Sequence, residues 1–378
     1  MPAQHQRRTC ILYRPDAKSF SACDSALPRQ QLTVRGALSS VVEHFLHTEG
    51  VAGSKPAART ICPMTFDRSG LATHLKSLAR ENIFVGTSSW KYRGWCGTVY
   101  DEARYVWKGR FAASRFERLC LAEYAETFKT VCLDSAYYKF PTGDSLKELA
   151  AQVPDDFKFA FKVTDEITLK KFTNLPRFGP RAGKQNENFL NAGRFASEFL
   201  LPCEPIKSKV GLLIFEFSHF YSSDFERGRD FVQALASFLS KLPTGWPYGV
   251  EIRNKEFLRP EYFDALRKHN VTHVYNSWAG MPSVGEQMNL DSSRTAADLW
   301  AARFLLKPGR KYQEAVDLFA PYTEIKEINQ EARDAGAKLL QDAKSKKPRR
   351  GAYIFVNNRL EGSAPMTIQA MVEQSNQP

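Results

Sequence analysis

Short apolar runs alternate with longer amphipathic segments from residue 83 to the end of the chain. The short runs are typical of buried strands, while the longer segments repeat apolar side chains at the spacing of a helix. This alternation predicts right-handed strand–helix–strand units and a parallel sheet. Eight runs are expected to be strands, at residues 83–86, 130–134, 157–163, 210–217, 248–253, 272–276, 302–309 and 352–358.

The segments between these runs carry helix signals. Pro202 is expected to end one of the amphipathic stretches, and Pro243 lies beyond the end of a second. Pro321 is expected to kink or break a third. The expected helices are residues 115–128, 146–152, 186–203, 227–242, 260–270, 312–331 and a final one from about residue 365.

Eight such units in about 290 residues favour an α/β fold of the closed (β/α)8 TIM-barrel type, which typically takes about 250 residues. A doubly wound open sheet is the alternative. The dinucleotide fingerprint GxGxxG is absent from the sequence, which weakens that alternative.

Residues 1–80 lack this periodicity. Within them, residues 37–61 resemble the conceptual translation of a transfer-RNA gene. We therefore interpret residues 1–80 as a disordered or spurious N-terminal extension, and residues 81–378 as a single TIM-barrel domain. A basic, acid-poor targeting peptide is the alternative interpretation of the extension.

The composition limits the compartment and the partners. No apolar stretch reaches the roughly 18 residues of a membrane span, so we expect no membrane association. Seven scattered cysteines without a CxxC pair indicate reduced thiols and a cytoplasmic location. A net charge of +12 permits nucleic acid as a partner, although a solvated basic surface is the simpler explanation. The oligomeric state stays open.

Polar side chains follow the predicted strands at their carboxyl ends, where TIM barrels place their sites. Nearly every strand ends in a charged or amide side chain, so these positions are the candidate site. In chain order they are Ser88, Trp90, Asp134, Tyr137, Tyr138, Lys162, Glu216, Glu251, Arg253, Asn276, Trp278, Lys307, Asn357 and Asn358.

Strand alternation predicts which charges point into the barrel. In YGVEIRN the apolar Val250 and Ile252 should face the helices, which turns Glu251 and Arg253 inward. The same parity turns Lys162 and Glu216 inward in their strands. Because buried charges must be paired, these groups form either a catalytic cluster or a structural ionic plug.

Glu216 and Glu251 are the candidates for paired-carboxylate acid–base chemistry, with Arg253 orienting Glu251 or binding an anion. Lys162 could act as a Schiff-base or general-base lysine if its pKa is lowered, but a glutamate partner would oppose that shift. Aromatic side chains that follow the strands predict a wall for a sugar or other ring. They are Trp90, Tyr138 and Trp278. The histidine spacing carries no metal signature, so we expect no metal site, and the cofactor is unknown.

Two loops suggest contacts with anions. The segments 307–312 and 357–365 follow the last two strands, where barrels often bind phosphate, and they supply Lys307, Arg310 and Arg359. The basic segment 170–189 is a lid, a polyanion contact or a plain surface insertion.

Six motifs in register resemble the YecE-like family, also called domain of unknown function 72. The resemblance covers about residues 83–372 and implies a TIM barrel, without an established reaction. Glu216 stands where many members have glutamine, and Pro308 replaces a histidine that many have near strand seven. The motifs are VGTSSWKYRGW, LDSAYYKFP, FAFKVTDEIT, YGVEIRN, PGRKYQEAVDLFAPY and YIFVNNRLEGSAP.

These features together predict a cytosolic barrel enzyme, of hydrolase or lyase/isomerase type, acting on a polar, anionic or carbohydrate-like small molecule. One alternative is a protein that binds or processes nucleic acid through a basic barrel face. Another is a ligand sensor without turnover. The sequence does not separate these three.

Overall fold

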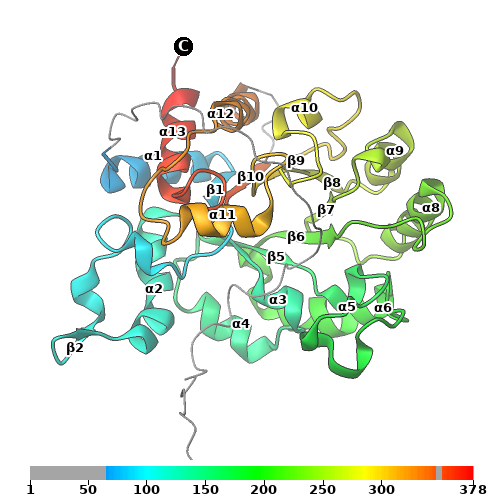
Figure 1. The fold of residues 1–378 in the computed structure, drawn as a ribbon, viewed down its shortest axis with the longest axis horizontal. Coiled ribbons are helices and arrows are strands. Elements are labelled where there is room, and N and C mark those ends of the chain that lie inside the picture. Colours follow the sequence, from blue (N-terminus) through cyan, green and yellow to red (C-terminus); the bar gives the residue numbers. More distant parts are fainter. Residues whose placement is uncertain (1–64, 346–350, 378) are drawn as a thin grey trace, which may run out of the picture. The chain divides into compact units, whose positions relative to one another are not determined.

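A computed structural model describes residues 65–345 and 351–377. Eight parallel strands close a barrel in the order β1-β10-β9-β8-β7-β6-β5-β4, and helices surround it (Figure 1). The predicted TIM barrel is confirmed. The barrel strands are β1 Ile83–Thr87, β4 Thr130–Leu133, β5 Lys158–Lys162, β6 Val210–Phe217, β7 Tyr248–Ile252, β8 Thr272–Asn276, β9 Leu299–Phe304 and β10 Gly351–Val356.

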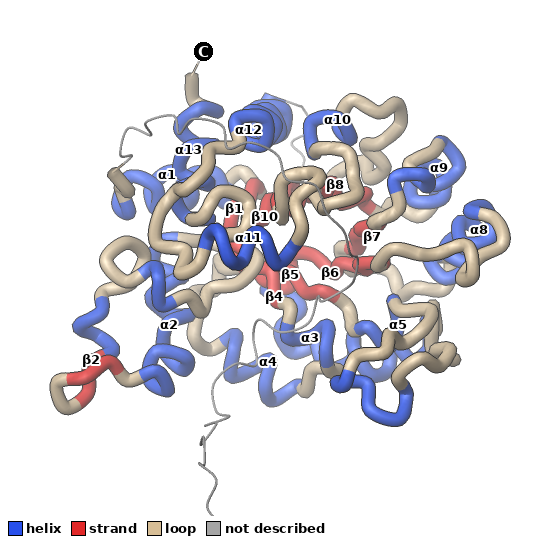
Figure 2. The backbone as a smooth tube through the Cα atoms, in the orientation of Figure 1, coloured by secondary structure: helices blue, strands red, loops and turns tan. Residues whose placement is uncertain are grey.

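Figure 2 shows the strands of the barrel gathered at the centre with helices around them, and β2 apart from the barrel. A small antiparallel hairpin, β2 Val106–Trp107 and β3 Arg110–Phe111, precedes α2. The α-helices are α1 Arg68–Arg80, α2 Ala113–Thr127, α3 Ser135–Tyr138, α4 Gly143–Ala150, α5 Asp165–Thr168, α6 Ala192–Phe195, α7 Leu201–Cys203, α8 Gly228–Leu239, α9 Pro260–Lys268, α10 Val284–Met288, α11 Tyr312–Phe319, α12 Gln330–Ser345 and α13 Ala364–Ser375. None of the helices in the described part of the chain is long and apolar enough to cross a membrane.

The barrel interior changes from apolar to ionic along the strands. Ala160, Leu212 and Ala301 belong to the apolar cluster inside the barrel, where the rings of Phe84 and Tyr353 stack at 5.0 Å. Further along the same strands, the same alternation brings charged side chains inward. The apolar part supplies the core, and the ionic part forms the candidate site.

The limited space inside the barrel explains why residue 249 is a glycine. A Cβ at Gly249 of β7 would lie 2.8 Å from Cγ2 of Val274 and 3.3 Å from Cδ1 of Leu212. No side chain fits there without displacing both neighbours. Two residues later the same face of β7 carries Glu251, so Gly249 sits directly beneath the ionic part of the interior.

The predicted start of the domain at residue 81 is too late. Helix α1 precedes it, packs against β1 and α2, and buries Leu71, Leu75 and Leu78. The side chain of Asp67 caps the helix by accepting a hydrogen bond from the amide of Gly70. Three buried leucines at helical spacing therefore extend the fold to about residue 67. Residues 1–64 lie outside the described residues, so the interpretation of that segment stays a prediction.

Strand seven was predicted at residues 302–309, but β9 ends at Phe304. The apolar residues Leu305 and Leu306 follow β9 and made the predicted strand too long. They lie in a loop, from which Leu306 packs against Ala315 and Phe319 of α11. The break predicted at Pro321 is confirmed, since α11 ends at Phe319 and α12 begins only at Gln330.

Candidate active site

Six charged side chains meet at the carboxyl ends of the barrel strands, and we call them the mouth cluster. Each of them lies either at an inward-facing position of a strand or at the first residue of the loop that follows a strand. They are Asp134 after β4, Lys162 on β5, Glu216 on β6, Glu251 on β7, Arg253 after β7 and Arg303 on β9.

Glu216 lies at the centre of the mouth cluster. Its Oε2 accepts from Lys162 Nζ at 2.7 Å, Arg253 Nη2 at 2.9 Å and Arg303 Nη1 at 3.0 Å. Burial works to raise the pKa of Glu216, but the three cations outweigh it and hold that pKa well below its ordinary value. Glu216 is therefore a fixed negative charge and cannot serve as a proton donor.

Glu251 is paired in register with Glu216 across β6 and β7. Both carboxylates are fully buried, so their repulsion requires a cation between them. Nη1 of Arg303 fills that place, at 2.7 Å from Glu251 Oε2 and 3.0 Å from Glu216 Oε2. Arg253 Nη2 contacts the other oxygen of Glu251 at 3.3 Å. The two glutamates thus hold the arginines in place.

Lys162 is a protonated amine in this environment. Burial pulls its pKa down, but Glu216 and then Asp134 outweigh that effect, and the pKa lies above its ordinary value. The ammonium nitrogen also lies 4.0 Å from the ring centroid of Tyr137, where a cation is favoured. A lysine in this state is a poor nucleophile, which argues against the Schiff-base role.

Asp134 is the member of the mouth cluster that reaches solvent. Its side chain is 38% exposed, compared with 5% or less for Lys162, Arg253 and Arg303. Its Oδ1 lies 3.8 Å from Lys162 Nζ and 3.6 Å from Arg303 Nη2. A substrate entering the mouth would therefore meet this carboxylate before the buried pair.

The expected aromatic wall is present in part. Trp278 stacks on the guanidinium of Arg253 at 3.9 Å, and the exposed Tyr138 lies edge-on to Tyr137. Trp90 is different, because it belongs to the large hydrophobic cluster between the barrel and its helices. We therefore assign Trp90 to the core.

Several polar atoms at the strand ends lack a hydrogen-bond partner among the described residues. Asn276 donates from Nδ2 to the carbonyl of Ile252 at 3.1 Å, which leaves its Oδ1 without a partner. Asn358 accepts from the amide of Ala364 at 2.8 Å and leaves Nδ2 without one. The buried hydroxyl of Ser88 is a third such group. These atoms are available to a polar ligand or to water.

Asn357 and Lys307 are less suited to binding. The side-chain oxygen of Asn357 accepts from the amide of Arg359 at 3.0 Å and serves the turn. Lys307 is exposed and pairs with Glu327 at 3.0 Å, and Arg310 pairs with the same carboxylate at 2.7 Å. Two of the three charges of the predicted anion site are thus paired with Glu327, which lies between α11 and α12.

Arg303 is the site residue that the sequence reasoning missed. The signal was present, because Trp300, Ala302 and Phe304 face the helices while Ala301 faces the barrel interior. The same alternation turns Arg303 inward. The strand was predicted to begin at residue 302, whereas β9 begins at Leu299. The prediction therefore missed the alternation at residues 300 and 301 that identifies Arg303 as inward-facing.

No group of three or more His, Cys, Asp and Glu side chains within residues 65–345 and 351–377 is arranged to hold a metal ion. His273 illustrates the structural use of histidine here. Burial lowers its pKa to about 4, and its Nδ1 lies 3.1 Å from the hydroxyl of Tyr262. It is therefore a neutral core histidine.

Comparisons with known proteins point to one family. The family model described as "Protein of unknown function DUF72" matches residues 84–378. A crystal structure of a DUF72 family protein from Enterococcus faecalis V583 aligns with a TM-score of 0.51 at 17% identity, covering 78% of this chain and 96% of that one. A DUF72 family protein from Thermotoga maritima MSB8 aligns with a TM-score of 0.47 at 18% identity, covering 77% and 98%. No curated protein matches the chain.

Proposed function

The chain belongs to the DUF72 family, whose model carries no assigned reaction, and from this premise we propose that it is a barrel enzyme with Asp134 as its proton-transfer group. Its substrate is a polar small molecule, either anionic or carbohydrate-like. The observation that carries the proposal is the exposure of Asp134 above a buried set of cations.

The acid–base role moves in this proposal from Glu216 and Glu251 to Asp134. A group that exchanges protons with a substrate must reach it and must change its protonation state. Glu216 is fully buried, and three cations hold its pKa low. Glu251 is equally buried and contacts two arginines. We therefore give both glutamates the role of positioning Lys162, Arg253 and Arg303.

The three cations give the mouth its substrate preference. Preorganised positive charges in a site that excludes water stabilise negative charge that develops during a reaction. Lys162 and Arg303 lie within 4 Å of Asp134, so an oxyanion formed beside that carboxylate would face them. This arrangement suits proton abstraction next to a carbonyl or carboxylate, and it also suits hydrolysis with Asp134 activating water. The class is thus lyase/isomerase or hydrolase.

The walls of the mouth support a carbohydrate-like substrate. Trp278, which is partly buried and stacked on Arg253, supplies an aromatic side chain. Oδ1 of Asn276 and Nδ2 of Asn358 have no hydrogen-bond partner among the described residues, and they supply an acceptor and a donor. Hydroxyl groups of a sugar satisfy such atoms at little cost in entropy when the atoms are already held in place. Ser88 adds a third polar contact.

The test uses the full chain and a panel of sugar phosphates, sugar acids and glycosides in D2O. Mass spectrometry would detect product formation and incorporation of deuterium. Asp134→Asn should lower the rate at least about 100-fold, because general acid–base catalysis contributes factors of that size. Asp144→Asn, on the exposed start of α4, is the matched control and should retain the wild-type rate. Full turnover by Asp134→Asn would overturn the proposal.

Nucleic-acid binding is the second candidate, and the basic segment after β5 is the observation that favours it. However, Arg177 pairs with Asp165 at 2.5 Å, and Arg181 pairs with Glu166. This pairing reduces the charge that the segment can offer to phosphates. Binding of oligonucleotides that weakens steeply with salt would favour this candidate. Tight binding of a small molecule without turnover would indicate a sensor.

A further inference from the structure

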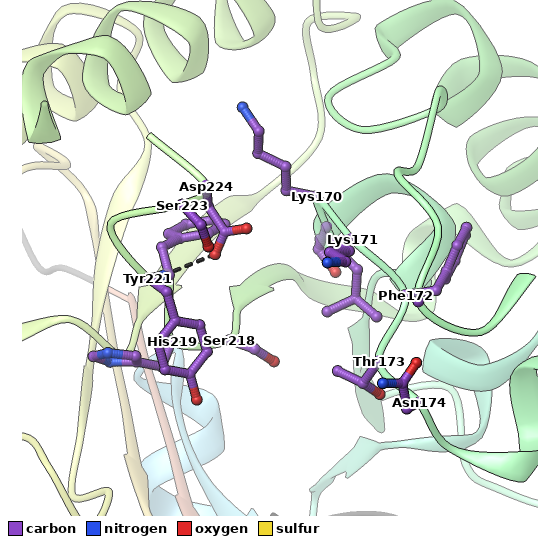
Figure 3. Close-up of a pocket in the computed structure, with 14 residues that line it drawn as sticks. Lys170, Lys171, Phe172, Thr173, Asn174, Ser218, His219, Tyr221, Ser223 and Asp224 are labelled. Carbon is purple, nitrogen blue, oxygen red and sulfur yellow. Dashed lines mark hydrogen bonds between the residues drawn. The ribbon is translucent and has the colours of Figure 1, made fainter. Parts of the chain in front are cut away.

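A cavity lies between the segment after β5 and the loop after β6. Figure 3 shows residues 170–174 on one side of it, and on the other side Ser218, His219, Tyr221, Ser223 and Asp224. Its volume is about 240 Å³. Pockets that take a whole small ligand usually have about 300–1,000 Å³, so this cavity fits one part of a ligand. We call it the side cavity.

The charge in the side cavity favours an anion. Lys170 and Lys171 lie on one wall, and neither ammonium has an ion-pair partner among the described residues. Lys170 is held over the ring of Phe225 at 3.7 Å. The carboxylate in the lining belongs to Asp224, and its Oδ2 accepts from the amide of Tyr221 at 2.8 Å. Two lysines and one aspartate thus line the cavity, and the carboxylate of that aspartate is already engaged in its own turn.

The remaining lining combines an apolar base with hydroxyl and amide groups. Leu169, Phe172 and Phe220 are buried and supply the apolar part. A polyol presents apolar C–H faces and hydroxyl edges, so it matches both kinds of surface. The other polar side chains of the lining are those of Thr168, Thr173, Asn174, Ser218, His219, Tyr221 and Ser223.

Ser218 connects the side cavity with the mouth cluster. It lines the cavity and follows Glu216 by two residues in the chain. Its hydroxyl also lies beside the phenol of Tyr137, whose ring covers the ammonium of Lys162. Burial and the Glu216 carboxylate raise the pKa of Tyr137, while Lys162 and Ser218 oppose that rise. Ser218 and Tyr137 thus form a line of contacts between the side cavity and Lys162 of the mouth cluster.

We propose that the side cavity is a binding subsite for the anionic end of a phosphorylated or carboxylated polyol. Lys171 and Lys170 neutralise the anionic group, and the hydroxyl groups bind the neighbouring polyol carbons. The proposal rests on the proposed function in one respect: the bound group is the remote end of the substrate whose reacting end meets Asp134.

The test is isothermal titration calorimetry on the full chain, with glucose 6-phosphate, glucuronate, inorganic phosphate and glucose as probes. The two charged sugars should bind more tightly than glucose, and inorganic phosphate should compete with the preferred one. The stronger of the two distinguishes a phosphoryl from a carboxylate preference. Binding of glucose equal to that of both charged sugars would overturn the proposal.

Two variants locate the binding. Ser223→Trp fills the side cavity from its rim, whereas Ser222→Trp alters the adjacent exposed residue, which does not line the cavity. Ser223→Trp should weaken binding of the preferred probe more than about tenfold, and Lys171→Gln about tenfold, because a charge-assisted hydrogen bond is lost. Ser222→Trp should bind as wild type. Unchanged binding by both Ser223→Trp and Lys171→Gln would place the probe elsewhere and overturn the proposal.

Failure of this proposal is separable from failure of the proposed function. Calorimetry reports binding without turnover, whereas Asp134→Asn reports turnover. If Asp134→Asn keeps full turnover while Ser223→Trp loses binding, the subsite stands and the catalytic assignment falls. If Asp134→Asn loses turnover while Ser223→Trp binds every probe as wild type, the catalytic assignment stands and the subsite falls.

Discussion

Two buried ionic regions of this barrel differ in how completely their charged groups are hydrogen-bonded and in whether they reach solvent. The first is the mouth cluster, and the second is a clamp formed by Arg333 of α12 and Glu361 of the β10–α13 loop. In the clamp, Nε and Nη2 of Arg333 each donate to Glu361 at 2.9 Å. Thr367 and the amide of Asn329 donate to the same carboxylate at 2.8 and 2.6 Å.

The clamp satisfies both oxygens of its carboxylate, whereas the mouth cluster leaves bonding capacity unused. Oε1 of Glu216 and Nε of Arg303 have no hydrogen-bond partner among the described residues. The mouth cluster also reaches solvent through Asp134, while Glu361 is fully buried. An ion pair whose hydrogen-bonding atoms all have partners serves to hold a loop in place. A cluster in which some hydrogen-bonding atoms have no protein partner, and one carboxylate reaches solvent, is suited to binding a ligand. The predictions below are ordered by the expected change in the free energy of unfolding.

The largest effect is expected for Arg333→Met. Removing this guanidinium leaves the charge of Glu361 buried without a cation, which typically costs about 3–5 kcal/mol. Urea unfolding measures the loss. The double variant Arg333→Met, Glu361→Leu should recover most of it, because the uncompensated charge is gone. A single variant as stable as wild type would show that the clamp contributes nothing.

Arg303→Met should cost somewhat less, on the order of 2–4 kcal/mol, because Glu216 retains Lys162 and Arg253 while Glu251 retains Arg253. The variant should also lose activity, since Asp134 loses a neighbouring cation. Arg118→Met on the exposed face of α2 is the control and should leave both quantities unchanged. If Arg303→Met is as active as wild type, the mouth cluster is a structural plug.

An effect of intermediate size is expected in how the free energy of unfolding depends on pH, because Glu216 of the mouth cluster contributes to that dependence. The pKa of Glu216 is depressed in the fold, so its contribution is present above its ordinary value of 4.5 and is lost as pH falls toward the lower folded pKa. Glu216→Gln should therefore show a shallower fall in the free energy of unfolding below about pH 4.5. The exposed Glu226→Gln should keep the wild-type slope. Equal slopes for the two variants would contradict the depressed pKa.

Asp134→Asn should change stability least, by under about 1 kcal/mol. The Asp134 side chain is 38% exposed, and its Oδ1 lies 3.6–3.8 Å from the two cations, which is beyond hydrogen-bond distance. A melting curve beside the turnover assay would separate the two effects. Large loss of activity with little loss of stability is the expected signature of Asp134. The reverse pattern would make this residue part of the structural network.

Much of this site was visible in the sequence because strand parity is local. Glu251, Arg253, Lys162 and Glu216 were expected to point inward, and they do. Parity requires only that a strand be recognised and correctly bounded. Strand parity did not identify Arg303, because the bounds of the strand were predicted wrongly. The apolar residues Leu305 and Leu306 led to a predicted strand at residues 302–309, whereas β9 spans Leu299–Phe304.

Periodicity in residues 83–378 determined by itself the barrel class, the identity of the strands and the inward direction of most charges, because these follow from spacing along one segment. Barrel closure decided the rest. It brought β6, β7 and β9 together so that one nitrogen of Arg303 bridges two carboxylates, and it left Asp134 at the surface. It also placed Trp90 in the helix-facing core. Pairing and exposure depend on neighbours that are distant in the chain, and no local pattern encodes them.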